Sequence, residues 1–184
     1  MPTIETVDGF DAHVELAGPE GAPAVVVLAA DGQMPSEYNT LCKLLHTASL
    51  RTMVIAADAR LSVNSVVGIM DTLEVRWALL VGDRDGAELA WRLAANRLDR
   101  FTALVVIDRG HPRSMDGPAG DAHCPPVEVN TTAVVTTAGA RQVVAAGQRF
   151  VYGDFRLVDM IGRRATEEFT AQLANEVVLR SSTW

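Results

Sequence analysis

The chain alternates between short apolar runs and stretches in which apolar residues recur at helical spacing. Apolar runs between turn residues predict strands, and a run that is apolar at nearly every position is typical of a parallel strand covered on both faces. The predicted strands cover 24–30, 52–57, 76–82, 102–107, 129–137 and 156–161. The predicted helices cover 36–48, a segment from Ser62 or Asn64 to Leu73, 87–97, 141–148 and the residues after Thr166. This order predicts an α/β fold with a parallel sheet between two layers of helices.

Two regions depart from the alternation. Residues 5–17 have an alternating pattern around the turn Asp8-Gly9, which predicts an N-terminal antiparallel hairpin. Residues 108–127 are rich in Gly, Pro, Asp and His and have no helical period, so we expect a crossover without a helix. Because a parallel crossover normally carries a helix, we expect part of one sheet face to be uncovered.

Single residues extend this prediction. Ser36 and Thr166 begin helical stretches and are the expected N-caps of those helices. Cys42, Trp77 and Trp91 occupy apolar patterns and are expected to pack in the core.

Length, charge and composition exclude several classes of protein. The 184 residues fit a single domain over 1–184, and the formal net charge of −7 argues against nucleic acid or an anionic membrane as the main partner. No apolar run approaches the ~20 residues of a membrane span, and no signal peptide is visible, so we expect a cytoplasmic protein. With Lys43 as the single lysine beside much Ala, Val and Arg, a GC-rich bacterial genome is indicated.

The stretch around 78–91 has the form of a nucleophile elbow. A buried strand at 78–81 leads into a turn in which Gly82 and Gly86 flank three charged residues, and an apolar helix follows. Glycines of this kind let the backbone pass through a tight, strained turn between strand and helix. The residue at the centre of this turn is Arg84, between Asp83 and Asp85.

The order and spacing of these segments resemble the alpha/beta-hydrolase fold family over nearly the whole chain. The matching residues are Met53-Val-Ile-Ala-Ala-Asp-Ala-Arg60, the elbow block Leu79–Ala87 with its helix, and Ala103-Leu-Val-Val-Ile-Asp108. The resemblance implies a three-layer sandwich with a mostly parallel sheet and an N-terminal antiparallel hairpin. Only about twenty residues follow Asp108 before the next strand, so we expect no cap domain.

The family's catalytic residues are missing from their usual places. Arg84 stands at the position of the nucleophile, and the loop 138–142 has no carboxylate where the family's acid usually lies. Gly162-Arg163-Arg164, interpreted as a basic turn, stands where the family has its histidine. Guanidinium groups stay protonated and cannot attack a carbonyl carbon. The sequence therefore predicts a non-catalytic member with a binding or assembly role, and the uncovered sheet face favours a homodimer or homo-oligomer.

Two alternatives stay open. The first is a small esterase-like hydrolase that uses non-standard residues of the 108–127 loop, with Asp108, His111 and His123 as the candidates. The second is a binder of a small anionic ligand at the elbow. The ligand-binding candidates for this role are Asp31, Gly32, Arg84 and Asp85.

Simpler interpretations compete with both. The elbow is expected to be either an Arg84 held by its two neighbouring carboxylates or a solvated turn. The set His111, Asp121, His123 and Cys124 has zinc-ligand chemistry, but its spacing fits no metal motif. We therefore expect no metal and no cofactor.

Overall fold

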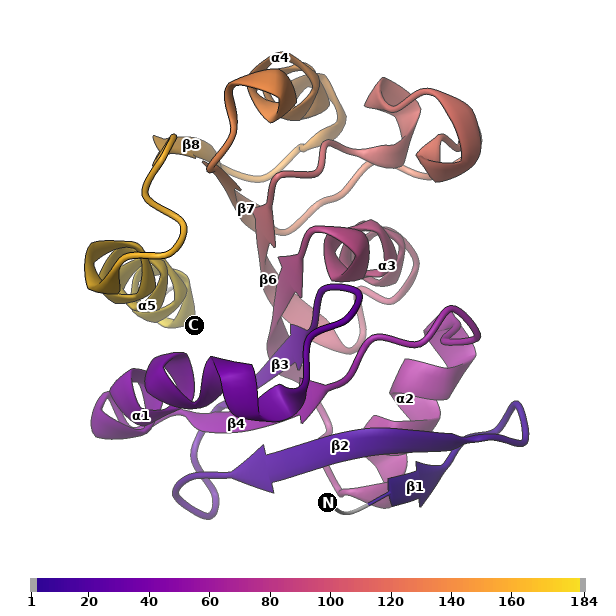
Figure 1. Cartoon of the computed structure of the whole chain (residues 1–184). Coiled ribbons are helices and arrows are strands. Elements are labelled where there is room, and N and C mark those ends of the chain that lie inside the picture. The colour runs from indigo at the N-terminus through magenta and orange to yellow at the C-terminus, as the bar shows by residue number, and fades with distance from the viewer. Residues whose placement is uncertain (1–2, 183–184) are drawn as a thin grey trace.

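The computed structural model describes residues 3–182 and has one eight-stranded sheet at its centre (Figure 1). The strands are β1 (Thr3–Glu5), β2 (Asp11–Ala17), β3 (Ala24–Leu28), β4 (Arg51–Ile55), β5 (Ala78–Asp83), β6 (Phe101–Ile107), β7 (Asn130–Val135) and β8 (Phe155–Asp159). Their order across the sheet is β1-β2-β4-β3-β5-β6-β7-β8. The pairs β1–β2 and β2–β4 are antiparallel, and all the others are parallel. The predicted hairpin and parallel sheet are confirmed.

Helices cover both faces of the sheet. They are α1 (Asn39–Thr47), α2 (Val63–Thr72), α3 (Asp85–Asn96), α4 (Ala138–Ala146) and α5 (Glu167–Ser181). The helices α1 and α5 lie on one face, and α2, α3 and α4 lie on the other (Figure 1). The predicted three-layer α/β sandwich is therefore confirmed. Within residues 3–182, none of these helices is long and apolar enough to cross a membrane.

The alternation of side chains along β3 divides the core into two halves. Successive side chains of a strand point to opposite faces of the sheet. Val25 and Val27 pack with residues of α1 and α5, whereas Val26 and Leu28 pack with residues of α2 and α3. All these strand residues are buried, which explains why β3 is apolar at every position.

The ends of several elements differ from the sequence prediction. Ser36 is not an N-cap, because it lies inside a 3-10 turn at Pro35–Tyr38 that precedes α1. Thr166 does cap α5, since its hydroxyl accepts a hydrogen bond from the amide of Phe169. Trp77 is 47 % exposed, so its predicted place in the core is wrong. It immediately precedes β5, at the amino edge of the sheet.

The crossover from β6 to β7 has no α-helix, as predicted, and contains 3-10 turns at Pro112–Ser114 and Gly117–Ala119. The uncovered sheet face predicted from this is wrong. Residues 103–107 of β6 and 131–135 of β7 are all buried. His111 packs edge-on against Trp91, and the centre of its ring lies 4.9 Å from that of Phe150. The crossover itself thus fills the space that a helix would occupy.

Candidate functional site

The turn between β5 and α3 has the strained geometry of an elbow. Arg84 has φ 48° and ψ −103°, a conformation that costs a residue with a side chain about 1–3 kcal/mol. The flanking glycines permit it by letting other backbone come close. A Cβ on Gly82 would lie 2.4 Å from Ala87 Cα, and one on Gly86 would lie 2.3 Å from the carbonyl oxygen of Leu28. The predicted elbow is confirmed, with Arg84 at its centre.

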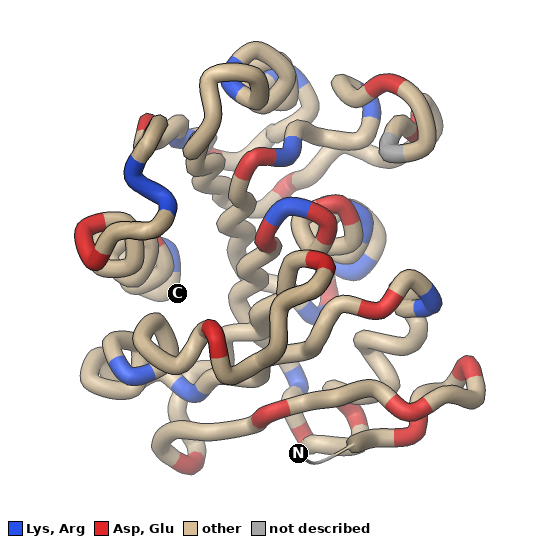
Figure 2. The backbone as a smooth tube through the Cα atoms, viewed as in Figure 1, with Lys and Arg blue, Asp and Glu red and all other residues tan. Residues whose placement is uncertain are grey.

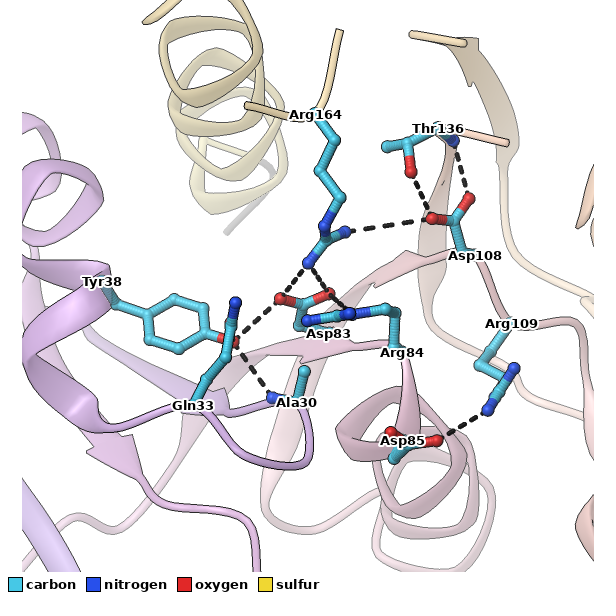
Figure 3. Close-up of polar contacts among 10 residues, drawn as sticks. All are labelled: Ala30, Gln33, Tyr38, Asp83, Arg84, Asp85, Asp108, Arg109, Thr136 and Arg164. Atoms are coloured by element: carbon cyan, nitrogen blue, oxygen red, sulfur yellow. Dashed lines mark hydrogen bonds and ion pairs between the residues drawn. The ribbon is translucent and has the colours of Figure 1, made fainter. Parts of the chain in front are cut away.

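Asp83, at the end of β5, is the centre of a polar cluster under the elbow (Figure 3). Its side chain is almost completely buried, and its two carboxylate oxygens lie 2.6 and 2.5 Å from Nη2 of Arg164. Nε of Arg84 lies 3.6 Å from the same carboxylate. The hydroxyl of Tyr38 donates a hydrogen bond to Asp83 Oδ2 at 2.8 Å. Residues from three parts of the chain therefore converge on one buried carboxylate.

Asp108, the first residue after β6, contributes a second carboxylate to the cluster. It accepts a hydrogen bond from the backbone amide of Thr136 at 2.6 Å and another from the Thr136 hydroxyl. Nη1 of Arg164 lies 3.9 Å from Asp108 Oδ2 and forms no hydrogen bond with any described residue. Arg164 thus lies between the two buried carboxylates (Figure 3).

The cluster is balanced in charge, with two carboxylates and the guanidinium groups of Arg84 and Arg164. Burial, and then the charge of Asp83, raise the pKa of Tyr38 well above its ordinary value of 10, so its hydroxyl stays protonated and can donate. The expectation that both neighbouring carboxylates hold Arg84 is wrong for Asp85, which pairs with Arg109 at 2.6 Å. Figure 2 shows the elbow beside residues 108–109, with acidic and basic positions next to each other in both segments.

The loop after β3 is also hydrogen-bonded to this cluster. In hydrolases with an elbow, an amide of this loop and the amide after the nucleophile form the oxyanion hole. Here the amide of Ala30 donates a hydrogen bond to the phenol oxygen of Tyr38 at 3.0 Å. Gln33 Oε1 lies 2.8 Å from the same phenol oxygen. Tyr38 therefore joins this loop to the elbow.

The ligand-binding candidates are only partly brought together. Asp31 and Asp85 line a cavity of about 660 Å³ that also reaches the ends of β3 and β4 and the first turns of α3. Gly32, with φ +73°, and Arg84 do not line it. Since Asp58 and Glu88 also line this cavity, its wall favours a cation more than an anion.

The candidates in the 108–127 loop do not assemble into a catalytic group. His111 is fully buried, and its Nε2 donates to the carbonyl oxygen of Pro125 while its Nδ1 accepts from the amide of Arg113. Burial lowers the pKa of His111, so its ring stays neutral. His123 is exposed, and no hydrogen bond in the described part of the chain joins either imidazole to Asp83, Asp85 or Asp108.

The zinc-like set does not form a metal site either. His111, Asp121, His123 and Cys124 are not among any group of three or more possible ligands within residues 3–182. Cys124 is buried, and burial raises the pKa of its thiol to about 11, which disfavours the thiolate that a metal would need.

Three members of the cluster were missed by sequence reasoning: Tyr38, Thr136 and Arg164. Only Arg164 had a usable signal, because it stands where the resemblance placed the family's histidine. Tyr38 lies within the predicted helical stretch 36–48 and its ring is buried, but the contacts of its hydroxyl follow no local pattern.

Comparisons with known proteins agree with the observed fold. No family model matches the sequence, and no curated protein does. Among solved structures, epoxide hydrolase A from Mycobacterium thermoresistibile superimposes with a TM-score of 0.77 at 13% identity, over 97% of this chain and 97% of that one. The enol-lactonase from Burkholderia xenovorans LB400 gives 0.74 at 15% identity, over 98% and 100%. An epoxide hydrolase from Vigna radiata gives 0.75 at 14% identity, over 100% and 97%.

Identities this low show the fold and leave the activity open. The sheet order, the elbow after β5 and the full-length superpositions agree with one another. This chain is an alpha/beta-hydrolase-fold protein, with no cap domain between β6 and β7.

Proposed function

We propose that this protein does not hydrolyse substrates and has a binding or assembly role in the cytoplasm. The observation that supports this is the pair of guanidinium groups in the cluster under the elbow. Arg84 stands where a nucleophile would attack, and Arg164 stands where a histidine would accept its proton. A protonated guanidinium has no lone pair for either role.

The two carboxylates of the cluster are also poorly placed for nucleophilic work. Asp83 is held by Arg164 and Tyr38, and Asp108 by the amide and hydroxyl of Thr136. A carboxylate whose oxygen lone pairs are taken up by hydrogen bonds is a weaker nucleophile. The amide of Ala30 is bonded to Tyr38, which leaves the oxyanion loop without that donor.

Hydrolysis of a panel of short-chain p-nitrophenyl esters tests the proposal. We expect the rate of the parent protein to equal that of Arg84→Ala and that of buffer. Saturable turnover by the parent would contradict the proposal, whatever the behaviour of the variant.

The alternative is a hydrolase that works through the 108–127 loop, and its support is that the structural neighbours are hydrolases. If the parent turns over, this alternative predicts that Asp108→Asn, His111→Gln or His123→Gln abolishes the activity while Arg84→Ala keeps it. Activity that survives all three loop substitutions would reject it.

For the assembly role, we propose a homodimer that forms at the β8 edge of the sheet. The strand β8 ends the sheet, and within residues 3–182 no strand pairs with its outer edge. Exposed strand edges are ready partners for another chain. Light scattering during gel filtration should give the mass of a dimer, and a monomer at all concentrations would reject this part of the proposal.

A further inference from the structure

Two arginines of this acidic chain differ from all the others in their surroundings. Within residues 3–182, Arg51 and Arg76 have no side-chain hydrogen bond, ion pair or ring contact, whereas each other arginine has an ion pair or lies over an aromatic ring. Carboxylates outnumber cations in this protein, so unpaired guanidinium groups are unexpected. Both of these arginines line the same cavity.

The lining residues of this cavity lie at or just before the amino ends of β3, β4 and β5, whereas the elbow follows the carboxyl end of β5. Its volume is about 310 Å³, and its wall combines the turn before β3, the start of β4 and residues 74–77 before β5. Pockets for small ligands begin at about this size.

The guanidinium of Arg51 needs a partner. Arg51 begins β4, and its backbone amide donates to the carbonyl oxygen of Pro23 at 2.9 Å, so its position is fixed by the sheet. Its Nε is buried from solvent and has no acceptor. A buried donor without an acceptor costs about 1–3 kcal/mol, and more when it is charged. A bound anion would remove this cost and reduce the repulsion between Arg51 and Arg76.

The remaining wall is suited to a flat apolar group. Trp77 lines the cavity and is 47 % exposed, and Pro23 and the buried Val75 lie beside it. Exposed indole and proline surfaces are favourable contacts for an aromatic ring. Glu74 is also in the wall, so two guanidinium groups and one carboxylate leave a single positive charge. One positive charge matches a monovalent carboxylate better than a phosphate dianion.

We propose that this cavity binds a small aromatic carboxylate. The carboxylate lies between the guanidinium groups of Arg51 and Arg76, and the ring lies against Trp77. A guanidinium can offer a carboxylate two parallel hydrogen bonds, which gives direction as well as charge. The site does not depend on the elbow, so it exists whether or not the protein hydrolyses any substrate.

Titration with 1-naphthoate, followed by the Nε–H resonances of arginine in ¹⁵N-labelled protein, tests this. We expect a saturable shift of the Arg51 Nε–H resonance. Arg51→Gln and Arg76→Gln should each weaken binding about tenfold or more, since each removes a charge-assisted hydrogen bond. Arg141→Gln removes an exposed arginine of α4 and should leave the affinity unchanged.

Two further measurements separate a ligand site from a structural role. Without ligand, Arg51→Gln should not lower the melting temperature, because the side chain has no partner to lose. Trp77→Ala should weaken the binding of 1-naphthoate more than it weakens the binding of acetate. The proposal is overturned if naphthoate does not bind, if both arginine variants bind it like the parent, or if inorganic phosphate binds as tightly as naphthoate.

Discussion

Replacing Arg164 by alanine should destabilise this protein strongly, because it leaves two buried carboxylates without their shared cation. Arg164 Nη2 lies within 2.6 Å of both oxygens of Asp83, whose side chain is 3 % exposed, and the side chain of Arg164 is 27 % exposed. Removing one partner of a buried ion pair costs about 3–5 kcal/mol. Solvent reaches part of Arg164, and Tyr38 and Arg84 still contact Asp83, so we expect a loss of about 3 kcal/mol.

Equilibrium unfolding in urea measures this loss directly. For a chain of this length, about 3 kcal/mol also lowers the melting temperature by roughly 6–12 °C. The matched control is Arg163→Ala, since Arg163 is the exposed neighbour and pairs with the exposed Glu168. Such a surface ion pair contributes about 0–1 kcal/mol to the free energy of unfolding, so we expect Arg163→Ala to cost no more than that.

A double-mutant cycle with Asp83→Asn shows whether the effect comes from the ion pair. We expect Arg164→Ala to cost much less in the Asp83→Asn background, because the buried charge is then absent. A loss below about 1 kcal/mol in the single variant, or additive losses in the double variant, would refute the reasoning.

Three other predictions follow from the packing. Burial lowers the pKa of His111 below its ordinary 6.5, so the unfolded chain binds more protons there below that pH. The urea midpoint of the parent should therefore fall as the pH is lowered below about 6.5, and less so in His111→Gln. Gly86→Ala should cost more than about 2 kcal/mol in unfolding free energy, because its Cβ would meet the Leu28 carbonyl oxygen. Trp91→Ala should cost about 3–5 kcal/mol and Trp77→Ala much less, since Trp91 is fully buried and Trp77 is not.

The fold could be predicted from the sequence because its strands are short, apolar and regularly spaced. The segment at 24–28 is apolar at every position, which is typical of a strand covered on both faces. Trp77 was misplaced because periodicity does not show where a strand leaves the covered part of the sheet. The crossover was correctly predicted to lack a helix, but the packing of His111 between Trp91 and Phe150 could not be predicted, since these residues are distant in the chain.

The site was predicted less completely for a similar reason. The elbow is a local feature, and Gly82, Arg84 and Gly86 identify it from their spacing alone. The residues of the cluster beneath it come from distant parts of the chain. Arg164 meets Asp83 across 81 positions of the chain, and no rule of spacing predicts that contact.

The most direct test of the central claim is the turnover of an epoxide and of an enol-lactone by the purified protein. The names of two structural neighbours indicate these two substrate classes. They are therefore the substrates with which residual hydrolytic activity on this fold would be sought first. We predict rates equal to those of buffer and of Arg84→Ala for both substrates. Saturable turnover by the parent that Asp108→Asn abolishes would contradict the account, and it would mean that the cluster of Asp83, Asp108 and Arg164 is a catalytic site.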